Sequence, residues 1–161
     1  MKAPLGRNGN GTRKNGNGLK TPPATLTVRP ALAGDAAPLS FFFDAVLRRD
    51  YFVRRGQLME MLTSRYHQVY VAEIDAVLVG VAVTTHGTRL VNALVHPAYR
   101  GLGIGRALVQ ATGATEVRAK VDMSTGDPRG FYRALGFESA ERGGNGGNIE
   151  TMRLARSGHG R

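Results

Sequence analysis

Arg100-Gly101-Leu102-Gly103-Ile104-Gly105 is the stretch that decides the fold of this chain. It follows the apolar run Leu90 to Val95 and leads into Ala107-Leu108, so alternating glycines stand between an expected strand and an expected helix. Glycine lets backbone N–H groups turn toward an anion with no Cβ in the way, and the first turn of a helix adds unsatisfied donors and partial positive charge. The pattern therefore predicts a phosphate cradle, and it favours a pyrophosphate as the ligand.

Two nucleotide-binding motifs are alternatives to this interpretation, and neither fits well. The dinucleotide fingerprint is G-x-G-x-x-G, whereas these glycines are spaced by two and two. A P-loop requires a lysine after its last glycine, and none follows here. A further alternative is a tight strand-to-helix turn that binds no ligand, and a second motif is needed to decide.

The second motif spans residues 127–138 and reads DPRGFYRALGFE. It predicts a short helix capped by Asp127, with Pro128 in its first turn and Gly136 at its end. Together, Arg-x-x-Gly-x-Gly after a strand and Phe-Tyr-x-x-x-Gly-Phe at a helix end resemble the GNAT superfamily of acyl-CoA-dependent N-acyltransferases. The resemblance covers roughly residues 25 to 154, and the opening residues 26–31 are similar to the way such domains begin.

Hydrophobic periodicity predicts a mixed α/β domain. Strands are expected at 25–29, 67–73, 76–85, 89–95, 115–122, 137–142 and 149–154, and helices at 35–47, 56–65, 105–112 and 127–135. Hairpins followed by a strand-helix-strand crossover imply one parallel strand pair. By resemblance, the fold is a central mixed, mostly antiparallel sheet with a splayed parallel pair, flanked by about four helices. Gly113 is expected to end the helix after the glycine loop earlier than in relatives.

Length and composition predict one domain with two tails. Residues 1–24 hold Gly-Asn repeats and basic side chains without an acid, and are expected to be disordered. Residues 25–154 form the acyltransferase-like domain, and 155–161 a flexible C-terminal tail. Of the formal charge of +10, half falls in the first tail, where it could attract nucleic acid but more often serves solubility.

The composition also excludes several kinds of site. The chain has no cysteine, which rules out disulfides, a catalytic thiol and thiolate metal ligands, and no metal site is expected. No apolar run is long enough to span a membrane, and the basic start is not followed by the apolar run of a signal peptide. A cytoplasmic location without a membrane partner is the expectation.

The resemblance implies a site for acetyl-CoA or another acyl-CoA. The strand at 89–95 would pair with the pantetheine arm, with Leu94 and Val95 offering peptide groups. The pyrophosphate would be wrapped by the glycine loop, whose residues are Arg100, Gly101, Leu102, Gly103, Ile104, Gly105 and Arg106. Ser124 and Thr125 stand where relatives often carry an asparagine, and their hydroxyls could bind the pantetheine.

Tyr132 falls on the tyrosine position of the family, where a phenol can donate its proton to the departing thiolate. Its reference pKa of about 10 lies above the value of about 8.5 for a thiol. The alternative is that Phe131 and Tyr132 only pack beneath the cofactor, and Phe131 is expected to belong to the core. The base is less defined, because the strand at 89–95 lacks the glutamate of many relatives. His86, Glu73, Asp122 and a water chain near Asn92 are the candidates.

The acceptor groove is expected between the first two helices, where arginines and aromatic residues gather. The candidate acceptor-binding residues are Arg48, Arg49, Tyr51, Phe52, Arg54 and Arg55. Such side chains suit a nucleic acid, a nucleotide or an acidic peptide, although a solvated helix end with Tyr51 and Phe52 packed inward is equally consistent.

These expectations combine into an N-acyltransferase that moves an acetyl or other short acyl group from acyl-CoA to an amine by direct attack. One alternative is a related enzyme that modifies a nucleic-acid base or nucleotide. Another is a noncatalytic module that binds acyl-CoA or nucleic acid, because fold does not fix function. The acceptor, the acyl length and the oligomeric state stay open, with a homodimer as one option.

Overall fold

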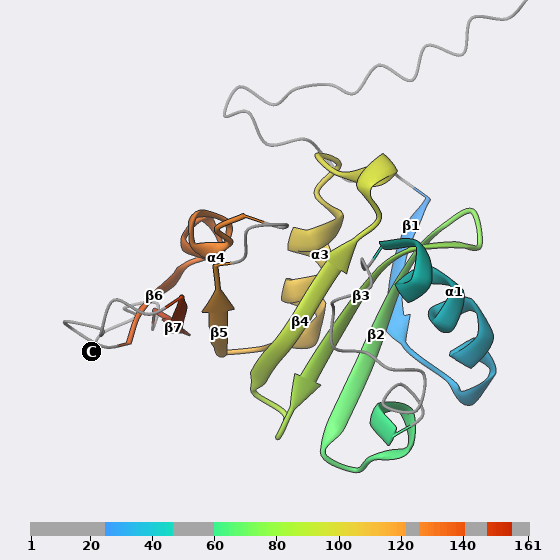
Figure 1. The fold of residues 1–161 in the computed structure, drawn as a ribbon, viewed down its shortest axis with the longest axis horizontal. Helices are drawn as coiled ribbons and strands as arrows, with labels where there is room; N and C mark the ends of the chain where they lie inside the picture. The colour runs from blue at the N-terminus through green and yellow to red at the C-terminus, as the bar shows by residue number, and fades with distance from the viewer. Residues whose placement is uncertain (1–24, 47–59, 122–125, 141–147, 156–161) are drawn as a thin grey trace, which may run out of the picture.

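A computed structural model describes residues 25–46, 60–121, 126–140 and 148–155 of the chain, and the ribbon is shown in Figure 1. Within this part a single sheet has the strand order β1-β2-β3-β4-β5-β7-β6. The strands are β1 (Leu26–Pro30), β2 (His67–Ile74), β3 (Val77–Thr85), β4 (Arg89–Val95), β5 (Glu116–Lys120), β6 (Phe137–Ser139) and β7 (Ile149–Leu154). The helices are α1 (Ala36–Val46), α3 (Ile104–Thr112) and α4 (Arg129–Ala134), with short 3₁₀ turns at Ala33–Asp35 and Pro97–Tyr99.

The mixed sheet confirms the predicted fold class. All strand pairs are antiparallel except β4 and β5, which run parallel and are joined by α3. The strands at 89–95 and 149–154 have the predicted ends, and α3 ends at Gly113, whose φ of 65° is the left-handed cap that glycine adopts easily. The helix expected at 56–65 is described only at 60–63, because 56–59 lie outside the described residues and 64–65 are not helical.

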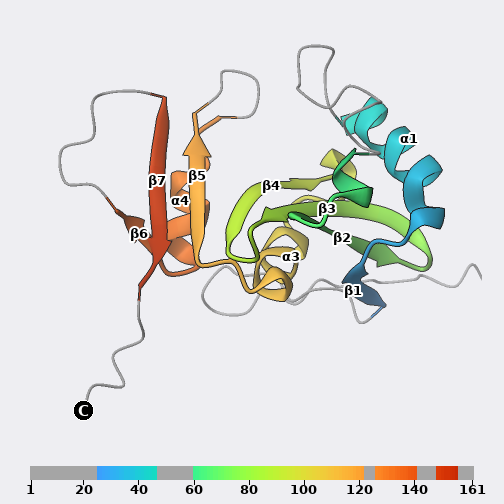
Figure 2. The same ribbon diagram turned by 90° about the horizontal axis from the view of Figure 1, so that it is seen from below.

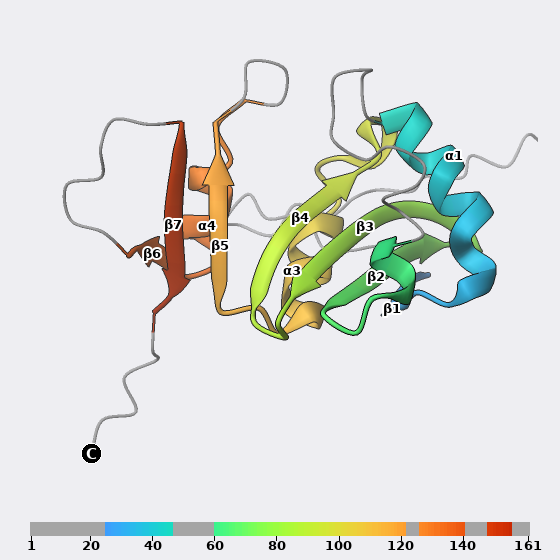
Figure 3. The same ribbon diagram turned by 60° about the horizontal axis from the view of Figure 1, so that its bottom comes forward.

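The parallel pair is short, and this shapes the molecule. Only Arg89 and Leu90 of β4 pair with β5, opposite Glu116 and Val117. Beyond these pairs the two strands separate, so that the sheet divides into β1–β4 and β5–β7, as Figures 2 and 3 show from two directions. The backbone of β4 from Val91 onward therefore faces an opening on its β5 side.

Two apolar clusters cover the two faces of the sheet. On one face, Leu39, Phe42 and Phe43 of α1 pack against valines of β2 and β3. On the other face, the cluster includes Ile104, Leu108 and Val109 of α3, and it continues through Tyr132 of α4 to the second half of the sheet. Figure 2 shows α1 and α3 on opposite sides of β1–β4. The amphipathic helices are thus fixed by burying their apolar faces.

A β-bulge in β4 decides which of its side chains lie on each face. Adjacent residues of β3 pair with Leu90 and with Asn92, which leaves Val91 as the extra residue. The extra residue reverses the alternation, because a shift of one residue moves a side chain to the other face. Leu90 packs with the α3 cluster, whereas Asn92 lies opposite Val83 of the α1 cluster and Leu94 packs against that cluster.

Two details of α4 differ from expectation. The helix begins at Arg129 with Pro128 as its N-cap, although the Asp127 carboxylate still accepts a hydrogen bond from the Arg129 backbone N–H at 3.0 Å. Phe131 was expected in the core, but 40% of it is exposed and only Tyr132 of this pair is buried. In a helix the two neighbours point about 100° apart, so one can face the core while the other faces the opening.

No helix in the described ranges is both long and apolar enough to cross a lipid bilayer.

Candidate active site

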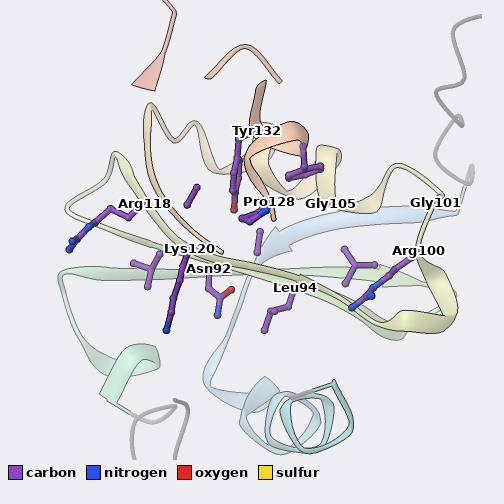
Figure 4. A pocket seen from close by; sticks show the side chains of 14 residues that line it. Asn92, Leu94, Arg100, Gly101, Gly105, Arg118, Lys120, Pro128 and Tyr132 are labelled. Atoms are coloured by element: carbon purple, nitrogen blue, oxygen red, sulfur yellow. The ribbon is translucent and has the colours of Figure 1, made fainter. Parts of the chain in front are cut away.

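A cleft of about 470 Å³ opens where β4 and β5 separate. Figure 4 shows it from close by. Its lining residues come from β4, the glycine loop, β5 and α4: Val91, Asn92, Ala93, Leu94, Val95, Arg100, Gly101, Gly105, Arg118, Ala119, Lys120, Pro128, Phe131 and Tyr132. The two motifs that are far apart in the sequence thus meet at one site.

The glycine loop forms one end of the cleft. Gly101 and Gly103 have φ values of 80° and 77°, a backbone conformation that other residues adopt only with strain. Gly103 is the N-cap of α3, so the free N–H groups of the first turn lie in this loop. Ile104 is buried and anchors the turn. A ligand here would meet backbone donors and the positive end of a helix.

Gly105 shows a second reason for glycine in this loop. A Cβ atom at this position would lie 3.3 Å from the Phe131 ring and 3.6 Å from a Val95 methyl group. The first distance is tight for carbon atoms, because they prefer about 3.5–4.0 Å. The absence of a side chain therefore allows the Phe131 ring of α4 to pack closely against the first turn of α3.

Leu94 and Val95 of β4, which the sequence suggested for cofactor binding, line the cleft together with Asn92. Figure 4 shows the side chains of Asn92, Leu94 and Lys120 directed toward the side of α1, with Tyr132 on the other side of the strands. Because β5 does not pair with this part of β4, the peptide groups of β4 can meet an extended ligand as a strand would.

Tyr132 combines a buried ring with a hydroxyl that faces the cleft. Its ring packs against Phe131 and Phe137, with ring centroids 5.2 Å and 5.8 Å apart, and only 7% of the residue is exposed. The hydroxyl points into the cleft in Figure 4, and within the described ranges no hydrogen bond holds it. Burial raises the pKa of this phenol to about 12, because the ionised form is poorly solvated. The phenol thus keeps its proton at neutral pH.

The charged side chains that line the cleft are Arg100, Arg118 and Lys120, and all are basic. Within the described ranges, no carboxylate lines it. Asp127 and Glu150, which lie near α4, are bound by Arg129 at 2.6 Å and 3.4 Å. Hydrogen bonding to Arg129 holds the pKa of Asp127 at about 2, below its usual range. The site is therefore suited to anions.

Several predicted site residues are not brought to the cleft. His86 lies in the turn between β3 and β4, where its ring is tilted against that of Tyr66 with centroids 5.5 Å apart. Glu73 on β2 is an ion-pair partner of Arg29. Leu102, Gly103, Ile104 and Arg106 belong to the loop and the first turn of α3, but they are not among the residues that line the cleft. Asp122, Ser124, Thr125 and the acceptor candidates Arg48, Arg49, Tyr51, Phe52, Arg54 and Arg55 lie outside the described residues.

Arg118 and Lys120 are the charged cleft residues that sequence reasoning missed. The sequence carried only part of the signal: exposed Arg118 and Lys120 alternate with buried Val117 and Ala119, which places them on one face of the strand but does not indicate a cleft there. The described ranges hold no group of acidic or histidine side chains able to bind a metal ion.

Comparison with known proteins agrees with this geometry. Residues 65–139 match the sequence profile of a family described as an acetyltransferase (GNAT) domain. No curated protein matches the chain significantly.

Solved structures resemble most of the chain. A GCN5-related N-acetyltransferase from Rhodopseudomonas palustris is 20% identical with a TM-score of 0.60, covering 85% of this chain and 97% of that one. The ribosomal-protein-S18-alanine N-acetyltransferase from Escherichia coli is 16% identical with a TM-score of 0.61, covering 84% and 98%. The PaiA N-acetyltransferase from Thermoplasma acidophilum, solved with coenzyme A, is 15% identical with a TM-score of 0.56, covering 81% and 99%.

At such low identity these structures establish the fold. The chain has a GNAT fold, and its residues 65–139 match the profile of the GNAT acetyltransferase domain.

Proposed function

We propose that the protein transfers an acetyl or other short acyl group from acyl-CoA to an amine by direct attack in the β4–β5 cleft. The observation that carries the proposal is the convergence on one cleft of a glycine loop at a helix N-terminus, an unpaired strand segment and the hydroxyl of a buried tyrosine. Acyl-CoA offers a matching set of groups: a pyrophosphate, an amide-containing arm and a thioester.

The residues present fit such a ligand in order along the cleft. The amides of residues 102–106 and the Arg100 guanidinium would hold the pyrophosphate. The peptide groups of Leu94 and Val95 would pair with the arm, and Ser124 and Thr125 stay candidates for further hydrogen bonds to it. Asn92 and Tyr132, which flank the middle of the cleft, would then lie beside the thioester.

Acetyl-CoA supplies a thioester carbonyl that an amine can attack, and the protein must stabilise charge as it moves to the sulfur. Tyr132 would donate a hydrogen bond from its hydroxyl to that sulfur. Its pKa of about 12 lies above the value of about 8.5 for a thiol, so complete transfer of its proton would be unfavourable by several kcal/mol. The proton that finally neutralises the thiolate therefore comes from the attacking amine, which loses it on forming the amide.

The composition of the cleft also affects how a protonated acceptor amine loses its proton before it attacks. Because no carboxylate lines the described cleft, the amine enters in its neutral form or loses its proton to water, held for example by Asn92. The ascending limb of activity against pH is then expected to follow the pKa of the acceptor. With two acceptors of different amine pKa, the midpoint of kcat/KM should move by the same difference. A midpoint common to both would indicate a base on the protein.

The test of the proposed activity is thiol release from acetyl-CoA with a panel of amines, peptides and nucleotides, with the product identified by mass. An amine-dependent rate and an acetylated amine would support the proposal. Binding of acetyl-CoA without turnover across the panel would favour the noncatalytic module. Acetylation of a nucleotide or nucleic-acid base alone would favour the nucleic-acid-modifying alternative.

A further inference from the structure

The carboxylates around the open side of β5 are already paired. Glu116, at the start of β5, accepts from Arg89 of β4 at 3.2 Å, and Arg153 of β7 lies 3.8 Å from it. Arg129 holds both Asp127 and Glu150 near α4. Each of these acids has an arginine partner, and none of them is an ion-pair partner of Arg118.

Arg118 is left over by this pairing. It lies on β5 between Glu116 and Lys120, is exposed, and has no ion-pair partner among the described residues. Arg100, which the proposed function uses for the pyrophosphate, is the other arginine of the cleft. Figure 4 shows Arg100 and Arg118 at opposite ends of the cleft. Arg100 at one end therefore has a proposed ligand, the pyrophosphate, whereas Arg118 at the other end has none.

The alternation of side chains along β5 places Arg118 on the face of the strand opposite the α3 cluster. Val117 and Ala119 are buried in the α3 cluster, so Arg118 and Lys120 lie on the opposite face of the strand. The bulge in β4 brings Asn92 to that same face. The cation thus lies on the α1 side of the strands, where the acceptor groove is expected between the first two helices, and not on the face filled by Tyr132.

We propose that Arg118, with Lys120 beside it, binds an anionic group of the acceptor, so that the preferred substrate is an amine carrying a carboxylate on a short chain. This inference rests on the proposed function. A guanidinium donates two parallel hydrogen bonds to a carboxylate, which gives both orientation and discrimination against a neutral amide. Lys120 adds a second positive charge on the same face.

The experiment uses CoA derivatives that join cofactor and acceptor in one molecule. In each, the sulfur of CoA is linked through a methylene-carbonyl group to the nitrogen of glycine or of β-alanine. Matched derivatives carry glycinamide or β-alaninamide, so that only the charge differs. Their affinities and that of free CoA are measured by calorimetry on the full chain, at one fixed salt concentration, because ion pairing at an exposed site depends on salt.

We expect at least one carboxylate derivative to bind about tenfold more tightly than its amide partner, which corresponds to about 1.4 kcal/mol. Arg118→Gln should reduce this ratio to near one without changing the affinity for free CoA. Arg118→Lys should keep part of the preference. Arg133→Gln is the matched control, because Arg133 is an exposed arginine of α4 that does not line the cleft, and it should keep the full ratio.

Equal affinities within both pairs, with free CoA still bound, would overturn this inference and leave the proposed function standing. A preference that survives in both Arg118→Gln and the double variant Arg118→Gln/Lys120→Gln would also overturn it. Failure of free CoA and of all derivatives to bind would instead contradict the proposed function, and the acceptor inference with it.

Discussion

At the scale of single residues, Tyr132 has its ring in the core and its hydroxyl at the cleft. Its ring belongs to the apolar cluster that joins α4 to the sheet, while its hydroxyl opens on the cleft. Removing only the hydroxyl oxygen should therefore leave the packing of the ring nearly unchanged and lower the rate of catalysis. The sequence motif identified this residue, because Phe-Tyr-x-x-x-Gly-Phe specifies the end of a helix that packs on a strand.

The first prediction concerns Tyr132→Phe. We expect kcat to fall about 100-fold with little change in acetyl-CoA affinity, because the lost hydrogen bond forms only as charge reaches the sulfur. Tyr70→Phe, a partly buried tyrosine of β2 outside the cleft lining, serves as the control. Steady-state kinetics by thiol release measure both. An equal loss in kcat and in cofactor affinity would contradict the role at the sulfur.

The second prediction uses the pKa of the same phenol. In the folded protein the pKa of Tyr132 is about 12, above the reference value of 10. The unfolded chain therefore loses this proton first, so the contribution of Tyr132 to the free energy of unfolding is fully present below pH 10 and is lost as pH rises toward 12. The total is about 2–3 kcal/mol. Urea unfolding of wild type and Tyr132→Phe between pH 9 and 12 should show a steeper decline for wild type. Parallel declines would mean that the hydroxyl is not desolvated.

The exposure of Phe131 and the location of Arg118 in the cleft could not be predicted from the sequence. The helical period alone could not decide which aromatic neighbour of the motif faces the core, because both are apolar. Arg118 could not be assigned to a site without knowing that β4 and β5 separate just before it.

At the scale of elements, the contact between β3 and α3 holds the glycine loop against the cleft. Gly80 of β3 lies directly under α3, and a Cβ there would come 2.8 Å from Leu108, 3.2 Å from Ile104 and 3.2 Å from the Leu94 carbonyl oxygen. Leu108 and Ile104 are buried and cannot move aside freely. The position of the loop thus depends on a residue without a side chain in the adjacent strand.

The third prediction is that Gly80→Ala lowers the free energy of unfolding by about 1–3 kcal/mol, as overpacking of a core does. Gly130→Ala in α4 is the control, because no atom lies within 4 Å of the added methyl group. It should be neutral or slightly stabilising, since alanine favours helix over glycine. Chemical unfolding of both variants tests this, and equal stabilities would show that α3 is not seated as described.

The fourth prediction concerns the connection from β1 to α1. Arg29 hydrogen-bonds Asp35 through two nitrogens at 2.8 Å and 2.9 Å, and also binds Glu73 of β2. This pairing holds the pKa of Asp35 at about 2, so its stabilisation is present above about pH 4 and is lost as pH falls toward 2. Asp35→Asn should therefore cost most stability near neutral pH. A cost that stays constant down to pH 2 would contradict the pairing.

The elements themselves were largely predictable, whereas the bulge was not. Strand alternation and capping residues locate β4 and α3 within a residue or two, because they are local properties. The face that Asn92 occupies depends on its register with β3, which no local pattern in residues 89–95 specifies. For that reason the sequence suggested Asn92 as a site residue without indicating the side on which it lies.

At the scale of the whole molecule, the division of the sheet creates the cleft, and the distribution of charge determines what the cleft attracts. The chain has a net charge of +10, of which residues 1–24 carry +5. The cleft in the described part adds its own basic residues without an acid. Positive charge is therefore present both in residues 1–24 and in the cleft. Binding at the cleft should not depend on residues 1–24, whereas binding through those residues should.

The fifth prediction separates these sources. Deleting residues 1–24 should leave acetyl-CoA affinity and turnover unchanged, because the proposed site lies wholly beyond them. Binding of nucleic acid through the tail would instead fall with deletion and decline steeply with salt. Calorimetry and a salt series on both proteins distinguish the two, and a loss of turnover on deletion would count against the assignment of residues 25–154 as the complete catalytic domain.

The most direct test of the account is calorimetric titration of acetyl-CoA into the full chain, beside Gly103→Val. Gly103 has a φ of 77° as the N-cap of α3, so valine should distort the donors of the first turn. The account predicts wild-type binding with a dissociation constant of roughly 1 µM to 1 mM and at least tenfold weaker binding by the folded variant. No binding by the wild type, or equal binding by the folded variant, would contradict the claim that this loop holds the cofactor.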